Sequence, residues 1–198
     1  MNHKFAPKSG RDLFRKVHLI LNVLSGLYRL FPLSVRVWLL EHHRKTRGKF
    51  GLGIRYSLLR TIAKSCGNNV SIHPDVYLLN PQNLSIASNV SIHPMCYLDA
   101  VGYIDIGENV SIAHGVSIIS ANHSYSDSVT PIKYQPIMTE IISISENVWI
   151  GAQAILLSGV RIESGCIIAA GAVVTRSTTP DSVYAGVPAR IIKDRYRQ

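Results

Sequence analysis

A repeated ten-residue stretch constrains the fold of this chain more than any other feature. "NVSIHPDVYL" occupies residues 69–78, "NVSIHPMCYL" residues 89–98 and "NVSIAHGVSI" residues 109–118, a spacing of 20 residues each time. After a break, "NVWIGAQAIL" at 147–156 has the same form. Because a unit this short cannot bury its apolar edge alone, successive units must stack on one another. The repeat therefore predicts a solenoid.

A shorter period of six residues lies inside each unit. Alternation such as Val148-Trp149-Ile150 is typical of a short strand, and Gly, Asn, Ser or Pro then turn the chain. Three such strands make one coil of 18 residues, and two extra residues at one corner give 20. We therefore predict an all-β solenoid, a parallel β-helix, with a narrow core. Its inward residues recur every six positions: Val70, Val76, Val90, Cys96, Val110, Val116, Ile142, Val148, Ala154, Val160, Cys166 and Ala172.

The chain before the repeats has a different composition. Residues 1–64 contain 14 Lys or Arg and 2 Asp or Glu, a balance of +12, whereas residues 65–198 contain 7 and 10, a balance of −3. Apolar residues at helical spacing predict a first helix with an inward apolar face made of Leu13, Val17, Ile20, Leu24, Leu27 and Phe31. Two more helices are predicted over 35–47 and 56–65. We expect two domains: a basic helical segment, 1–65, that caps the β-helix, and the β-helix itself, 66–198.

The basic segment has more than one conceivable partner. Its first apolar stretch, 17–40, is interrupted by polar residues, glycine and proline, which argues against a spanning helix. The favoured interpretation is a cap over the open end of the β-helix, and the alternative is an interfacial helix on an anionic membrane. Nucleic acid is disfavoured, because the aromatic residues have a helical spacing that suits packing better than base stacking.

Cysteine usage and the first residues bear on the compartment. Cys66, Cys96 and Cys166 form no C-x-x-C pair and are odd in number. A disulfide framework is therefore not expected, and a reducing cytoplasm fits best, with Cys96 and Cys166 as small core residues. "MNHKFAPKSGRD" lacks the apolar run and cleavage site of a secretory signal. We expect a cytoplasmic protein, at most bound to the inner face of the membrane.

Three motifs in the second half resemble those of a known family. They are an Asn-His loop at 122–123, the Val-Trp-Ile-Gly segment at 148–151, and the tail "AAGAVVTRSTTPDSVYAGVPARII". With the six-residue repeat, they resemble the hexapeptide-repeat acyltransferases, in the branch that contains galactoside, maltose and polysaccharide O-acetyltransferases. The resemblance covers about residues 65–193. It implies a left-handed β-helix, a homotrimer with active sites between subunits, and acetyl-CoA as donor, with no metal.

His123 is the leading candidate for catalysis. Transfer of an acetyl group to a saccharide hydroxyl needs a base, and histidine titrates in the right range. His123 lies at the start of the break in the repeat, 120–141, and the resemblance places it on the family's loop histidine. The break corresponds to a loop that reaches toward a neighbouring subunit. Because Ile142 follows Val116 in phase, we expect an inserted loop on an intact coil.

The other candidate site residues follow largely from the resemblance. For the acceptor they are Asp99, Asn122, Tyr125 and Trp149, although Asp99 equally suits a turn and Trp149 a subunit contact. For acetyl-CoA the backbone amides of Gly151 and Ala152 are candidates for the acetyl oxygen. Ala170, Thr175, Arg176, Arg190 and Lys193 are candidates for the pantetheine arm and the phosphates, and Lys193 equally suits a solvated tail.

Three alternative functions stay open at this stage. Some left-handed β-helix trimers are zinc carbonic anhydrases, and His93, His114 and His123 have the side chain that zinc prefers. An N-acetyltransferase of an amino sugar would use the same base. A scaffold without catalysis is the third. The favoured prediction is an acetyl-CoA-dependent O-acetyltransferase of a saccharide in surface polysaccharide synthesis.

Overall fold

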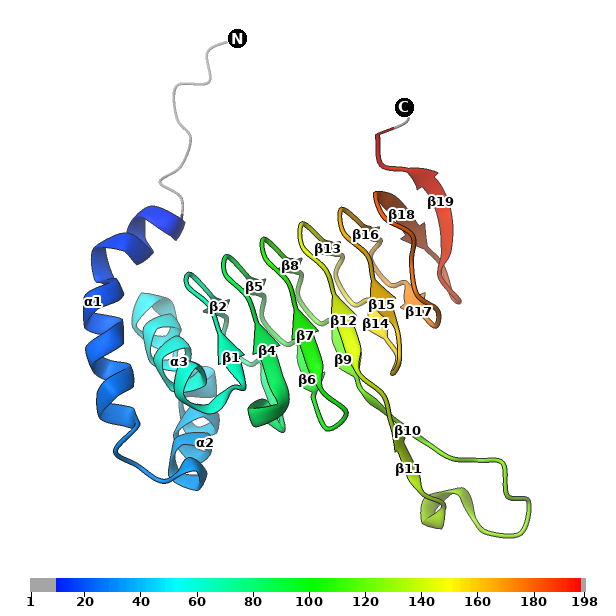
Figure 1. Ribbon diagram of the computed structural model, residues 1–198, viewed down its shortest axis with the longest axis horizontal. Coiled ribbons are helices and arrows are strands. Elements are labelled where there is room, and N and C mark those ends of the chain that lie inside the picture. The colour runs from blue at the N-terminus through cyan, green and yellow to red at the C-terminus, as the bar shows by residue number, and fades with distance from the viewer. Residues whose placement is uncertain (1–9, 197–198) are drawn as a thin grey trace.

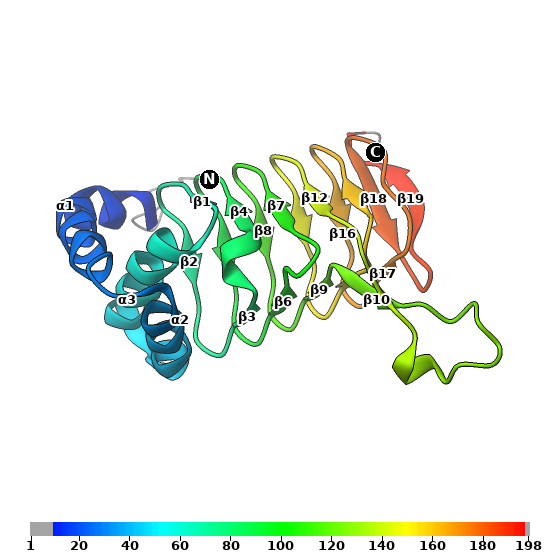
Figure 2. The ribbon, with the colours of Figure 1, turned by 60° about the horizontal axis from the view of Figure 1, so that its bottom comes forward.

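The chain folds into a helical layer followed by a solenoid of stacked coils (Figure 1). The structure is a computed structural model that describes residues 10–196. The helical layer contains α1 (Gly10–Tyr28), α2 (Leu33–His42), the short 3₁₀ helix η1 (His43–Lys45) and α3 (Gly48–Ile62). α3 lies between α1 and the first coil, so α1 is the outermost element at this end of the molecule (Figures 1 and 2).

Three parallel sheets form the sides of the solenoid, and each coil adds one strand to each sheet. The first sheet contains β1 (Ser65–Cys66), β4 (Leu84–Ile86), β7 (Ile104–Ile106), β12 (Ile142–Ile144) and β15 (Arg161–Ile162). The second contains β2 (Ser71–Ile72), β5 (Ser91–Ile92), β8 (Ser111–Ile112), β13 (Trp149–Ile150), β16 (Ile167–Ile168), β18 (Ser182–Ala185) and β19 (Arg190–Asp194). The third contains β3 (Tyr77–Leu79), β6 (Tyr97–Asp99), β9 (Ser117–Ile119), β14 (Ile155–Leu156) and β17 (Val173–Val174). The predicted fold class is confirmed.

The six-residue period is the period of the core. All twelve predicted inward residues are at most 4% exposed, including Cys96 and Cys166 at 0%. Strand β12 pairs with β7 in parallel, with Ile142 opposite Ile104, so the solenoid continues in phase beyond the break. Burial raises the pKa of the Cys96 thiol to about 11, which keeps it protonated and inert.

The recurring Asn before each valine has a conformational cause. Asn69, Asn89, Asn109 and Asn147 all have φ between +55° and +62°, the left-handed region that asparagine tolerates better than most residues. Each residue turns the chain into a strand of the second sheet. The Asn69 side-chain amide also donates to the Asn89 side chain in the next coil (3.0 Å). In the repeated Asn-Val pair, the asparagine thus marks a corner of the coil and the valine marks an inward core position.

Arg55 joins the helical layer to the first coil. Its side chain is 1% exposed, and its Nε–H donates to the Ile72 carbonyl at the end of β2 (2.8 Å). Its Nη1 donates to the carbonyls of Thr46 (2.7 Å) and His43 (3.0 Å) in the turn before α3. Burial lowers the pKa of the guanidinium, and the carbonyl oxygens offset that desolvation.

The predicted bounds of two helices were wrong. α2 ends at His42 instead of continuing to residue 47, and α3 begins at Gly48, eight residues before the predicted start. α3 contains two glycines that lie close to neighbouring residues. A Cβ on Gly51 would lie 2.0 Å from the Thr46 carbonyl oxygen, and one on Gly53 would lie 3.2 Å from Leu21. Residues 65–66 form the first strand instead of the helix end.

The predicted inward face of α1 was correct only in part, since Val17 and Leu24 are half-buried. Phe14, Leu21 and Tyr28 pack against the core, whereas the predicted Ile20 and Leu27 are 68% and 54% exposed. The predicted Leu13 lies outside the side chains that the structure describes. Periodicity could not select the buried face, because α1 carries apolar residues on more than one side.

Close contact between coils predicts opposite effects for two Gly-to-Ala substitutions. A Cβ on Gly107 would lie 2.7 Å from the Ser145 carbonyl carbon and 2.8 Å from the Glu146 nitrogen in the next coil, so Gly107→Ala should destabilise the fold by about 1–3 kcal/mol. Gly26 in α1 has no atom within 4 Å, so Gly26→Ala should be neutral or stabilise by up to about 1 kcal/mol. Chemical unfolding of both variants measures the difference, and equal effects would contradict the coil contact.

Candidate active site

The inserted segment is a hairpin that leaves the solenoid after the third sheet. Strands β10 (Ala121–His123) and β11 (Ile137–Thr139) pair antiparallel, and the short 3₁₀ helix η3 (Ile132–Tyr134) lies near the far end. Its root is fixed by Ser120, which is fully buried. The Ser120 hydroxyl donates to the Asp99 carbonyl (2.6 Å) and accepts from the Gly102 N–H (2.8 Å). The hairpin projects well away from the coils (Figure 1).

His123 is the last residue of β10 and lies three residues beyond this fixed root. It is exposed and stands opposite Ile137 across the hairpin. Within residues 10–196, no hydrogen bond is made by its ring. The preceding Asn122 donates through its side-chain amide to the Ser158 hydroxyl (2.5 Å), which ties the hairpin to the corner after β14. A histidine held at this root with a free ring can accept a proton from a bound hydroxyl.

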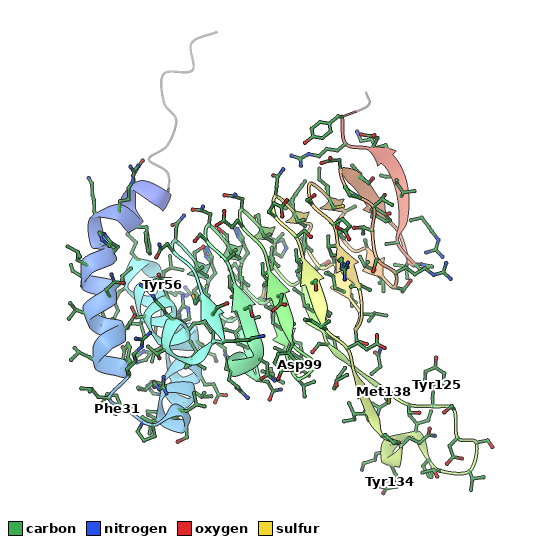
Figure 3. The ribbon with its side chains drawn as sticks, in the orientation of Figure 1. Phe31, Tyr56, Asp99, Tyr125, Tyr134 and Met138 are labelled. Atoms are coloured by element: carbon green, nitrogen blue, oxygen red, sulfur yellow. The ribbon has the colours of Figure 1, made fainter. Side chains whose placement is uncertain are left out.

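The far part of the hairpin is organised by its own side chains. The Gln135 amide is buried and donates to the carbonyls of Asp127 and Thr130, both at 2.8 Å, while its oxygen accepts from the Asp127 N–H (3.2 Å). Hydrogen bonds from the Thr130 hydroxyl and from the Val129 and Thr130 amides lower the pKa of Asp127. Tyr125, predicted to contact the acceptor, is 80% exposed on the outer part of the hairpin (Figure 3).

Asp99 occupies the corner below the hairpin root. Its Oδ1 accepts from the Asn80 side-chain amide and from the Val101 N–H, both at 3.2 Å. The turn role considered for Asp99 is therefore present. The same residue's carbonyl receives both the hydroxyl and the backbone N–H of Ser120 (2.6 and 3.1 Å). Asp99 thus stabilises the base of the hairpin through its backbone carbonyl, and among the described residues the second oxygen of its carboxylate is not used in the turn.

The predicted donor residues line one corner of successive coils. Ala152 and Ala170 occupy the same position in neighbouring coils, between the second and third sheets, and the Gly171 N–H donates to the Ala152 carbonyl (2.8 Å). Trp149 precedes this corner on the outer face of the second sheet and is 53% exposed, as the alternation predicted.

One expectation at this corner was wrong. The Gly151 N–H does not point to a ligand, because it donates to the Ile168 carbonyl (2.7 Å). A Cβ on Gly151 would also lie 2.5 Å from the Ala170 nitrogen, so this glycine allows close stacking of two coils. Within the described part of the chain, the neighbouring Ala152 N–H has no hydrogen-bond partner. Ala152 is therefore the amide that remains available to an acetyl oxygen.

The four polar residues predicted to contact acetyl-CoA lie near the C-terminal end of the solenoid. Thr175 and Arg176 follow β17 and are exposed. Arg190 and Lys193 lie on β19, which pairs antiparallel with β18, and both side chains are exposed. The Arg190 Nη1 donates only to the adjacent Ala189 carbonyl (2.9 Å). None of the three cations, Arg176, Arg190 and Lys193, forms an ion pair within residues 10–196, so they present uncompensated positive charge.

These groups flank the outer face of the third sheet on both sides. The corner with Ala152 and Ala170 precedes β14 and β17. At the opposite corner the hairpin root follows β9, Ser158 follows β14 and Arg176 follows β17. Between these two corners, the third sheet consists of the two-residue strands β14 and β17. A thin acyl chain along this face would therefore have a histidine on one side and an amide donor on the other.

The stacked histidines and a small cavity lie elsewhere. His93 stacks on His73 in the neighbouring coil, with ring centroids 4.8 Å apart, and burial lowers the pKa of His73. Within residues 10–196, no three His, Cys, Asp or Glu side chains are grouped to hold a metal ion. A cavity of about 60 Å³ lies between α2, α3 and the first coil, near Arg55 and Tyr77, and includes none of the predicted site residues.

Three residues that support the site were not identified from the sequence. Ser120, Ser158 and Gln135 fix the root and the end of the hairpin through single hydrogen-bonding side chains. Ser120 carried one signal, since it is the first residue of the break in the repeat. Ser158 and Gln135 carried none, because their partners are distant in the sequence or depend on the loop conformation.

Comparisons with known proteins agree with this architecture. The family described as "Bacterial transferase hexapeptide (six repeats)" matches residues 142–176. Galactoside O-acetyltransferase of Escherichia coli K12 is 31% identical over 140 residues, which cover 71% of this chain and 68% of that protein.

Solved structures give the same result over a longer stretch. A maltose O-acetyltransferase from Clostridium difficile 630 superposes with a TM-score of 0.73 at 26% identity, covering 83% of this chain and 86% of that one. A galactoside acetyltransferase in complex with coenzyme A has the same TM-score, 0.73, and identity, 26%, with 86% and 82% covered. The resemblance inferred from the motifs is confirmed, and the chain belongs to the hexapeptide-repeat O-acetyltransferase family.

Proposed function

We propose that this protein transfers an acetyl group from acetyl-CoA to a hydroxyl of a saccharide. The observation that carries the proposal is the placement of His123, an exposed histidine with a free ring at a root fixed by Ser120, beside the outer face of the third sheet. Relatives named galactoside and maltose O-acetyltransferases support the reaction, and a relative that binds coenzyme A supports the donor. Acetylation of a surface polysaccharide is the physiological role we propose.

In this mechanism His123 acts as general base. The ring accepts the proton of the acceptor hydroxyl as its oxygen attacks the thioester carbonyl, so no acyl-enzyme is needed. The Ala152 N–H donates to the carbonyl oxygen as negative charge develops there. His123 then delivers its proton to the departing thiolate. The hydrogen bond from Asn122 to Ser158 holds the backbone beside His123 in place.

The rest of the site is proposed to bind the two substrates. Ala170 lets the pantetheine arm approach the backbone, while Thr175, Arg176, Arg190 and Lys193 bind phosphate oxygens. Tyr125, Trp149 and Asp99 contribute to the acceptor site. An amino sugar could replace the hydroxyl acceptor with the same base, but no observation on this chain favours that alternative.

We also propose that the active unit is a homotrimer. The hairpin carries exposed apolar side chains on a segment with little contact to its own coils: Tyr125 (80%), Val129 (88%), Ile132 (56%), Tyr134 (73%) and Ile137 (61%). Such a surface is expected to be covered by another chain. Packing of the hairpin on a neighbour would enclose the open face of the third sheet and complete the site. We place this trimer in the cytoplasm.

The role of His123 predicts a large loss of rate from one substitution. His123→Ala should fold normally, retain acetyl-CoA binding and lose transfer by about 10²–10⁴-fold. The matched control is His42→Ala, which removes an exposed histidine at the end of α2, in the helical layer, and should retain transfer. Thiol release with a saccharide acceptor measures both, and equal rates in the two variants would exclude His123 as the base.

The phosphate contacts predict a change in donor affinity. Arg176→Gln and Arg190→Gln should each raise the KM for acetyl-CoA about tenfold, because a hydrogen bond from a charged donor is lost, and should change kcat little. Arg161→Gln removes an exposed arginine from the first sheet and serves as the control. An unchanged KM in both test variants would contradict this placement of the donor.

The trimer predicts a coupled loss of assembly and activity. Light scattering should give the mass of three chains for the native protein. Replacing Tyr134 and Ile137 by Asp should lower that mass toward one chain and lower kcat/KM, because the hairpin no longer completes the neighbouring site. Full activity in a protein that sediments as a single chain would contradict the proposal.

A further inference from the structure

Helix α1 has a second apolar face that nothing in the described chain covers. Leu19 (68%), Ile20 (68%), Val23 (66%) and Leu27 (54%) are exposed at a spacing that places them along one side of the helix. The exposed row continues past the helix end with Leu30 (80%) and Phe31 (47%). We call these six residues the outer face of α1.

This face is separate from the one that stabilises the fold. Phe14 packs edge-on against Tyr56 at 5.5 Å, and Ser25 donates to the Leu21 and Ser57 carbonyls, so the opposite side of α1 is already used by α3. A helix that is apolar on both sides normally has a partner on both sides. Figures 1 and 2 show α1 at the extreme end of the molecule, with no element beyond it.

Charge identifies the kind of surface that fits there. Arg15 and Lys16 precede the outer face and Arg29 lies within its span, between Leu27 and Leu30, all exposed. Only Asp12 and Glu41 are acidic in the first 64 residues, which hold 14 Lys or Arg, and Asp12 is paired with Arg15 at 2.6 Å. A second copy of this chain would bring like charges together at the contact. An anionic lipid surface has both the apolar layer and the opposite charge that this arrangement requires.

We propose that the outer face of α1 docks the enzyme on an anionic membrane, with the helix lying in the interface. No helix within residues 10–196 is long and apolar enough to span a bilayer, so the contact is peripheral. Leu19, Val23 and Leu27 enter the acyl boundary, while Lys16 and Arg29, which form no ion pair within residues 10–196, meet lipid phosphates. The first helix is thus a cap on one side and a membrane contact on the other.

The docked orientation deepens the proposed function, on which this step rests, by defining the acceptor class. α1 crosses the end of the solenoid, so the solenoid axis stands away from the membrane (Figure 1). Because α1 lies in the interface, one further helical layer of about 10 Å and three coils spaced about 4.8 Å apart separate the lipid headgroups from the hairpin root, roughly 25 Å. A sugar beside a lipid headgroup would not reach His123. We therefore infer an acceptor that is an extended saccharide carried on a membrane lipid.

Flotation of the full-length protein with lipid vesicles tests the docking. Vesicles of phosphatidylcholine with phosphatidylglycerol should bind the protein, vesicles of phosphatidylcholine alone should bind it weakly, and high salt should reduce binding. Replacing Leu19 and Val23 together by Glu should lower the bound fraction about tenfold or more, because charge replaces buried apolar area. The control is Ile192→Glu, a 60% exposed apolar residue at the opposite end of the molecule, which should bind like the native protein.

Transfer to a soluble saccharide separates this proposal from the proposed function. The Leu19 and Val23 double variant should acetylate a soluble saccharide at the native rate while it fails to bind vesicles, which supports docking. Native protein that does not float with anionic vesicles, or a double variant that floats as well as native, would overturn it. A change in the mass of the double variant in solution would also overturn it, since the face would then be covered by another copy. If no saccharide is acetylated, the proposed function fails while the vesicle result still decides the docking.

Discussion

Every coil of this protein depends on backbone hydrogen bonds to the coil on each side. Strands of only two or three residues cannot hold a sheet alone, so their stability comes from stacking in register over a core of small apolar residues. An open end would leave unpaired N–H and C=O groups, a liability that proteins cover. Here α3 covers the first coil through Arg55, and the antiparallel strand β19 finishes the second sheet at the other end. A side-chain hydrogen bond from a helix thus covers the first end, whereas backbone pairing with an added strand covers the other.

The same stacking determines where the solenoid can accept an insertion that carries a functional site. An insertion at a corner leaves the ladder intact, as the pairing of Ile142 with Ile104 on the far side of the hairpin demonstrates. Ser120 is the last side chain held by the coil, and His123 lies three residues further, so a rigid scaffold positions a residue whose ring remains free. Close stacking also explains Gly151, whose amide is used between coils and is therefore withdrawn from the acetyl site that we propose.

Much of the fold could be predicted because the core and the corners share one period. The inward residues from Val70 to Ala172 and the in-phase continuation at Ile142 followed from spacing alone. The predictions failed in the helical layer, where the six-residue period gives no information about the structure. The first eight residues of α3 were not predicted as helix, and α1 has apolar residues on both sides, so Ile20 and Leu27 were placed inward. Within the proposed site, His123 was recognisable from the break, whereas Ser158 and Gln135 depend on contacts that only the folded chain creates.

The central claim is that the hairpin root and the corner at Ala152 form a site for acetyl transfer to a saccharide. The most direct measurement is thiol release from acetyl-CoA against a panel of saccharides, with mass analysis of each product. We expect at least one saccharide to gain a single acetyl group on a hydroxyl in proportion to the thiol released. Tight binding of acetyl-CoA without any acetylated product, or product in which only amines are modified, would contradict the account.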